Sequence, residues 1–210
     1  MLMMTTPFQA APDTAVTGLD NPSWIRRAML IEQVAEAYAD GTFTPAQRHQ
    51  AEDLFRTAIY DHEALARGVL AESLKRMTHV PRDIVLSLAR DEAQVARPIL
   101  RTSPLLDDDD LVEIARECSR AHRLAIAERH ALSAKVAQAL CESRDPQVIR
   151  ALLANESAAL PEALLHAILD ALDDAPGIVD AMTRRRLLPA SVTNRLARES
   201  ARGYAAARRA

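Results

Sequence analysis

Glycine is scarce in this 210-residue chain, which contains only five, and aromatic residues make up only 3% of the sequence. A β-rich protein with many tight turns, or a nucleotide site built on a glycine-rich loop, needs more glycine than this. Few aromatic side chains also means few surfaces on which nucleic-acid bases could stack. These shortages disfavour β-rich and nucleotide-binding classes and predict an all-α protein.

Cysteines and long apolar runs are scarce as well. The two cysteines, Cys118 and Cys141, do not amount to the disulfide framework of a small secreted protein. Residues 1–20 contain no lysine or arginine and no sustained apolar core, so they do not resemble a signal peptide. No apolar run reaches the roughly 18 residues that a membrane helix needs. We therefore expect a cytoplasmic protein without membrane insertion, in which residues 1–20 are disordered.

Charge is balanced, although the basic residues are almost all of one kind. The net charge is −3, and lysine occurs only at Lys75 and Lys135, so arginine supplies the other 24 of the 26 basic residues. Hydrophobic residues make up 49% of the chain. This composition supports a core built from small aliphatic side chains and does not indicate disorder or a globally basic nucleic-acid binder.

Two series of apolar positions recur along the chain. The first series consists of pairs four residues apart: Val85/Ala89, Leu111/Ala115, Val136/Leu140, Leu164/Ile168 and Val192/Leu196. The second series begins each time at Leu65, Val95, His122, Val148 and Ile178, and continues four residues later at Val69, Ile99, Ile126, Leu152 and Met182. Positions i and i+4 share one face of a helix. Each copy is therefore expected to be a pair of short helices.

Successive copies of the first series lie 25 to 28 residues apart, which is typical of an α-solenoid of stacked helix pairs. A column of compact residues runs through the second series, at Gly68, Pro98, Ala125, Ala151 and Ala181, and predicts close approach between helices. We expect a capping helix at residues 21–41, which Gly41 ends, the repeats at 42–200, and a basic tail at 201–210.

The boundaries between helices carry recognisable signals in the stretch VARPILRTSPLLDDDDLVEIAR. Pro98 is expected in the first turn of a helix, where a missing amide donor costs little. Ser103-Pro104 should end that helix, because the residue before proline avoids the helical region. The four aspartates 107–110 could cap the next helix or hold a cation. A calcium loop needs six or more oxygen ligands and a glycine at its turn, which is absent, so capping is preferred.

Several phrases of the sequence occur together in one known family. These are LSLARDEAQVARPIL, DLVEIAR, HRLAIAERHALS and VIRALLANESAALPEALL, which occur in this order. On these phrases the chain, from roughly Thr44 to Leu196, resembles the bacterial family called domain of unknown function 2336. The resemblance implies a HEAT-like helical-repeat domain, and it supplies neither a catalytic motif nor a ligand.

The titratable residues offer only one candidate for metal-binding or thiol chemistry. Cys118 and His122 are four residues apart, as metal ligands on a helix can be, but they straddle an expected turn and no second pair exists. His122 also occupies an apolar column, so a packed, hydrogen-bonded histidine is the alternative. No HExxH motif, phosphate loop or Gly-x-Ser-x-Gly elbow is present. We expect no enzyme activity, no metal and no cofactor.

Arginines recur beside the apolar positions of the second series. The candidate partner-binding residues are Arg67, Arg97, Arg101, Arg150 and Arg184. They are expected to face outward along the concave surface of the solenoid, where forked arginine donors suit carboxylates or phosphates. Leu124, Glu128 and Asp180 interrupt this series. A solvated face with local ion pairs is the alternative, and the basic C-terminal region has the same two interpretations.

Three functions compete on these observations. The first is a non-catalytic scaffold or adaptor, with a regulatory role, that binds another protein of acidic surface. The second is a nucleic-acid-binding repeat protein, which the net charge and the lack of aromatics disfavour. The third is a repeat-fold enzyme, which would need an acid or nucleophile in a cleft with aromatic walls. The first is our hypothesis, and it leaves the oligomeric state open.

Overall fold

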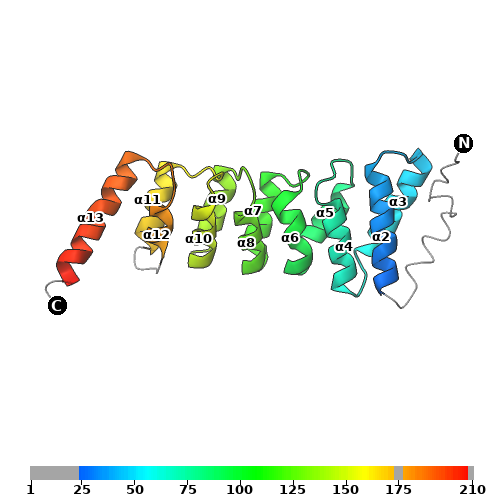
Figure 1. Ribbon diagram of the computed structural model, residues 1–210, viewed down its shortest axis with the longest axis horizontal. Coiled ribbons are helices and arrows are strands. Elements are labelled where there is room, and N and C mark those ends of the chain that lie inside the picture. Colours follow the sequence, from blue (N-terminus) through cyan, green and yellow to red (C-terminus); the bar gives the residue numbers. More distant parts are fainter. Residues whose placement is uncertain (1–23, 173–176, 208–210) are drawn as a thin grey trace, which may run out of the picture. The chain divides into compact units, whose positions relative to one another are not determined.

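The computed structural model describes the backbone of residues 24–172 and 177–207. These ranges contain twelve α-helices, labelled α2 to α13, and no strand (Figure 1). The prediction of an all-α protein is therefore confirmed for the described part of the chain. No helix in that part is long and apolar enough to cross a membrane. The predicted disordered segment, residues 1–20, lies outside the described residues.

The chain divides into two compact units, with the boundary between Leu106 and Asp107. Unit 1 contains α2 (Trp24–Ala39), α3 (Pro45–Ala58), α4 (Ala64–Leu74), α5 (Arg82–Ala89) and α6 (Ala93–Thr102). Its helices pack alternately: α2 contacts α4 and α4 contacts α6, while α3 and α5 each contact the helices beside them in the sequence (Figure 1). The region predicted as a capping helix is thus α2, and Gly41 follows it with a left-handed φ of 69°.

Unit 2 contains α7 (Asp108–Glu117), α8 (Arg120–Ala127), α9 (Ala134–Glu142), α10 (Pro146–Ala154), α11 (Glu162–Leu172), α12 (Ile178–Thr183) and α13 (Ala190–Ala207). The alternate pattern recurs: α7 contacts α9, α8 contacts α10, α10 contacts α12, and α11 contacts α13. One apolar cluster contains residues of α10, α11, α12 and α13. Ile149, Leu165, Ile178 and Val192 belong to it, and each is at most 2% exposed. α12 therefore packs against the rest of the unit although it is only six residues long.

The first apolar series lies in the core, as its spacing predicts. Nine of its ten positions are buried, and Leu164 is half-buried. The second-series positions from Val95 onward are also buried, but the register predicted for the copy in α4 is wrong. Leu65 is 58% exposed, whereas Ala66 and Leu70 are fully buried. The inward face of α4 therefore lies one residue later than predicted, which turns it by about 100° around the helix axis.

The helix boundaries follow the capping signals. Asp107 accepts a hydrogen bond from the Asp110 amide at 2.9 Å, and Asp110 accepts one from the Asp107 amide at 3.0 Å. This reciprocal capping box confirms that the aspartate run begins a helix. Ser103 ends α6 in an extended conformation before Pro104, also as predicted.

Two local predictions fail. Pro98 is the sixth residue of α6 rather than part of its first turn, because the helix already begins at Ala93 after Glu92. The column of compact residues from Gly68 to Ala181 also does not mark close helix-to-helix contact at every position. Ala125 is 2% exposed, but a Cβ atom placed on Gly68 would meet nothing within 4 Å. Close helix approach therefore does not explain the glycine.

Candidate functional site

A groove in unit 2, about 460 Å³ in volume, brings together two of the predicted partner-binding arginines. We call it the α10–α12 groove, because α10, the residues after it, α12 and the residues flanking α12 line it. Figure 1 shows where these two helices lie in the chain. Its lining consists of Arg150, Leu153, Ala154, Glu156, Gly177, Asp180, Ala181, Arg184 and Arg185. The groove therefore brings together Arg150 of α10 and Arg184, which directly follows α12.

Gly177 allows Arg150 to lie close to the start of α12. The glycine has a left-handed φ of 80°, a conformation that other residues adopt only with strain. A Cβ at this position would lie 3.4 Å from Cδ of Arg150, so the arginine stem packs over the backbone there. The half-buried Arg150 side chain is thus held against one wall of the groove.

The two consecutive arginines after α12 have different roles. Arg185 donates through Nη1 to the carbonyl oxygens of Leu153 and Asn155, both at 2.9 Å. These acceptors lie at the C-terminal end of α10, where carbonyl groups lack helical partners, so Arg185 ties α12 to α10. Arg184 is exposed, and its side chain makes no hydrogen bond or ion pair with any residue that the structure describes. Arg184 is therefore available to an external ligand.

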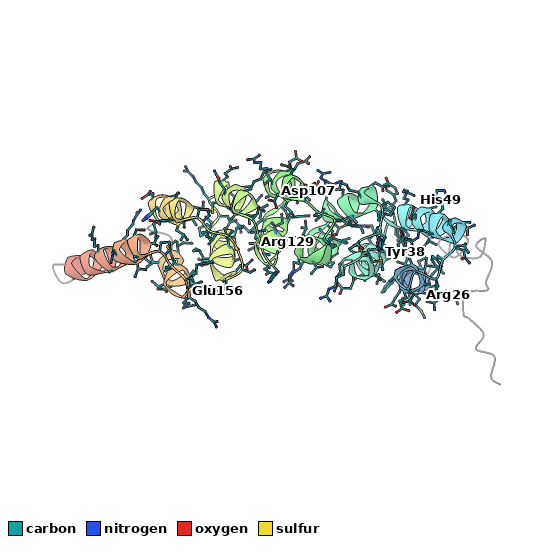
Figure 2. All side chains as sticks on the ribbon, turned by 90° about the horizontal axis from the view of Figure 1, so that it is seen from above. Arg26, Tyr38, His49, Asp107, Arg129 and Glu156 are labelled. Carbon is teal, nitrogen blue, oxygen red and sulfur yellow. The ribbon has the colours of Figure 1, made fainter. Side chains whose placement is uncertain are left out.

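The groove has mixed charge. Glu156 and Asp180 line it together with the three arginines (Figure 2, in which Glu156 is labelled), while Leu153, Ala154 and Ala181 supply apolar surface. The Glu156 carboxylate accepts a hydrogen bond from the Arg186 amide at 3.2 Å. A continuous polyphosphate would meet these carboxylates as well as the arginines, whereas a peptide of mixed sequence could match both.

Arg67 does not face outward as predicted. Its side chain is 11% exposed and donates through Nε and Nη2 to the Asp91 carboxylate at 2.6 and 2.8 Å. Nη1 donates to the Asp61 carbonyl oxygen at 2.6 Å. The displaced register of α4 explains this position, since the residue after buried Ala66 points toward the next helix. Arg27 of α2 makes the corresponding bidentate contact with Asp61, at 2.5 and 3.0 Å.

Arg97 and Arg101 are exposed residues of α6 in unit 1, one helical turn apart. They therefore share a face of that helix. The structure thus groups Arg150 with Arg184 in unit 2, places Arg97 and Arg101 together in unit 1, and buries Arg67 in an ion pair. A partner-binding role for these residues remains a prediction.

The residues considered for metal or thiol chemistry lie apart from the groove lining. His122 is 6% exposed, and its Nδ1 lies 2.8 Å from Oγ of Ser119, as expected for a packed histidine. Burial raises the pKa of Cys141 to about 12, so its thiol is a poor nucleophile near neutral pH. In the described part of the chain, no group of three or more His, Cys, Asp or Glu side chains could hold a metal ion.

The sequence analysis did not identify Gly177 or Arg185 as parts of the site. Gly177 directly precedes Ile178, the head of the last second-series copy, so a glycine at that junction was the available signal. Arg185 occupies a polar position that recurs at the ends of the second-series helices, but the sequence does not identify its acceptors, which are backbone carbonyl groups about 30 residues away. Only the packing of α12 on α10 reveals that contact.

Part of the chain matches a known protein family. Residues 95–208 match the family described as "Uncharacterised protein conserved in bacteria (DUF2336)". This range covers more than half of the chain and includes the whole α10–α12 groove. No curated protein and no solved structure matches the chain.

Proposed function

Starting from the fact that this chain belongs to the DUF2336 family of bacterial proteins, we propose that it is a non-catalytic protein-binding scaffold. In this proposal each unit is an array of HEAT-like helix pairs, and the α10–α12 groove of unit 2 binds an acidic segment of a partner protein. The alternate packing supports the repeat architecture, since six pairs of helices contact each other across one intervening helix: α2 and α4, α4 and α6, α7 and α9, α8 and α10, α10 and α12, and α11 and α13.

The observation that supports the binding role most is the unequal use of the groove's arginines. Arg185 is committed to backbone carbonyl groups, whereas exposed Arg184 has no partner among the described residues. Arg184 stands beside Arg150, whose stem Gly177 positions. Two forked donors beside a small apolar wall suit a carboxylate followed by a small apolar residue.

A protein ligand fits this groove better than a nucleic acid does. Glu156 and Asp180 belong to the lining and repel phosphate groups, and no aromatic residue lines the groove to stack a base. In a peptide ligand, each of these carboxylates could face a basic residue instead. The mixed lining therefore favours an acidic segment that also contains some basic residues.

A photo-crosslinking amino acid at Ala154, an exposed residue of the groove, tests this assignment directly. After irradiation in the native organism, we expect a crosslinked protein whose attached peptide contains clustered Asp or Glu residues. The same crosslinker at Ala46, an exposed residue of unit 1, serves as the control and should not capture that peptide. Crosslinking of Ala154 to nucleic acid alone, or to peptides without acidic residues, would contradict the proposal.

A further inference from the structure

Unit 1 contains a separate pocket of about 560 Å³, a size typical of small-molecule sites. It lies where the C-terminal ends of α2 and α4 meet the first turns of α3. Tyr38, Arg48, Arg76, Met77 and His79 line it, together with small residues. None of these residues belongs to the α10–α12 groove, so the pocket is independent of the function proposed above.

Tyr38 is a fixed part of the pocket wall. Its side chain is only 2% exposed, and Figure 2 shows it among the helices of this unit. The hydroxyl group lies 2.9 Å from the Glu52 carboxylate and 2.8 Å from the His79 carbonyl oxygen, and its single proton can be donated to either acceptor. The guanidinium of Arg48 lies 4.5 Å from the centre of the Tyr38 ring, in a cation–π contact. This stacking holds Arg48 in place before any ligand arrives.

The charge of the pocket is positive. Arg48, Arg76 and His79 line it, and no lining residue is acidic. Arg76 is exposed and makes no hydrogen bond or ion pair with the residues that the structure describes. The ends of α2 and α4 contribute about half a negative charge each, which the two full charges of the arginines exceed. Glu52, which contacts Tyr38, does not line the pocket.

We propose that this pocket binds a small molecule that carries an oxyanion, phosphate or carboxylate, on an apolar or aromatic body. Arg48 belongs to α3 and Arg76 follows the end of α4, and each presents forked donors that suit such an anion. Met77 and Ala39, which line the pocket, supply apolar surface for the rest of the ligand. The anion would also relieve the mutual repulsion of the cationic side chains.

Isothermal titration calorimetry at constant ionic strength tests the proposal with three probes: phenyl phosphate, benzoate and inorganic phosphate. We expect saturable binding of phenyl phosphate or benzoate, and the tighter of the two identifies the anion. Inorganic phosphate should bind more weakly, because it has no apolar body. Arg76→Ala should weaken binding by about tenfold or more, since it removes charge-assisted hydrogen bonds.

Arg26→Ala is the matched control, because Arg26 is also an exposed arginine of unit 1 without a described partner, and it does not line the pocket (Figure 2). It removes the same charge and should leave the affinity unchanged. The proposal is overturned if neither aromatic probe gives saturable binding. Equal weakening by both substitutions would also overturn it, since binding would then reflect net charge alone.

Discussion

Single ion pairs in unit 1 join one helix to the residues that precede another. Asp61 lies before α4, and its side chain is only 5% exposed. Burial raises the pKa of this carboxyl group, but the Arg27 guanidinium and the Glu63 amide outweigh that effect and hold the pKa below its ordinary value. Asp61 therefore stabilises the folded chain mainly in its charged form.

This pair predicts a specific acid sensitivity. Because the pKa of Asp61 is lower in the folded chain than in the unfolded one, its contribution is complete above about pH 4 and is lost as the pH falls toward the folded-state pKa. Asp61→Asn should lower the urea midpoint at pH 7 and flatten its decline below about pH 4. Asp40→Asn, at an exposed position without a described partner, should change neither. Equal pH profiles for all three proteins would contradict this account.

Two glycines of unit 1 give a second prediction. A Cβ on either Gly68 or Gly41 would meet nothing within 4 Å, but only Gly41 has a left-handed φ. Gly68→Ala should therefore stabilise the chain by up to about 1 kcal/mol, because alanine favours a helix interior. Gly41→Ala should destabilise it. Urea unfolding with an unchanged m-value measures both effects. Destabilisation by Gly68→Ala would show that the helices are crowded at this column.

At the scale of helices, the first turn of α7 depends on its capping box. Asp107→Ala removes the acceptor for the Asp110 amide and should cost about 1 kcal/mol of unfolding free energy. Asp109→Ala is the control, since Asp109 forms an exposed ion pair with Lys135 rather than a capping hydrogen bond, and the loss of such a pair should cost less, under about 1 kcal/mol. Calcium should not change the unfolding midpoint of the unmodified protein. A saturable rise with calcium would contradict the capping role.

Most helices could be predicted from the sequence because apolar spacing reports directly which face is buried. The series from Val95 onward shows this, since each of its heads is buried in its helix. The spacing failed in α4, where both Leu65 and Ala66 are apolar and the pattern does not decide which one faces inward. The burial of Arg67 then depends on Asp91, 24 residues away, and local periodicity contains no information about that pair.

The site was predictable only in part for a similar reason. Arg150 and Arg184 were identified from their places in the repeat, and α10 and α12 do bring them to one groove. The pocket beside Tyr38 was missed, because Arg48, Arg76 and His79 belong to no repeating column. Their proximity arises from the packing of α2, α3 and α4, and a pattern along the chain does not report it.

At the scale of the whole molecule, the chain is slightly acidic, whereas arginines outnumber acidic residues in the groove. The chain carries a net charge of −3, yet three arginines and two acidic residues line the α10–α12 groove. Long-range attraction to nucleic acid is therefore weak, while short-range contacts can still select an acidic peptide. Such contacts should also weaken with added salt, because ion screening reduces charge-assisted binding near the surface.

The most direct test of the protein-binding claim is the affinity of the partner crosslinked at Ala154 for purified variants, measured by calorimetry at several salt concentrations. Arg150→Glu/Arg184→Glu should weaken binding by at least about tenfold while the helical content stays nearly unchanged. The control variant Arg26→Glu/Arg198→Glu reverses the charge at two exposed positions outside the groove. This variant should bind the partner as tightly as the unmodified protein does. If the groove variant binds as tightly as this control, the α10–α12 groove is not the partner site.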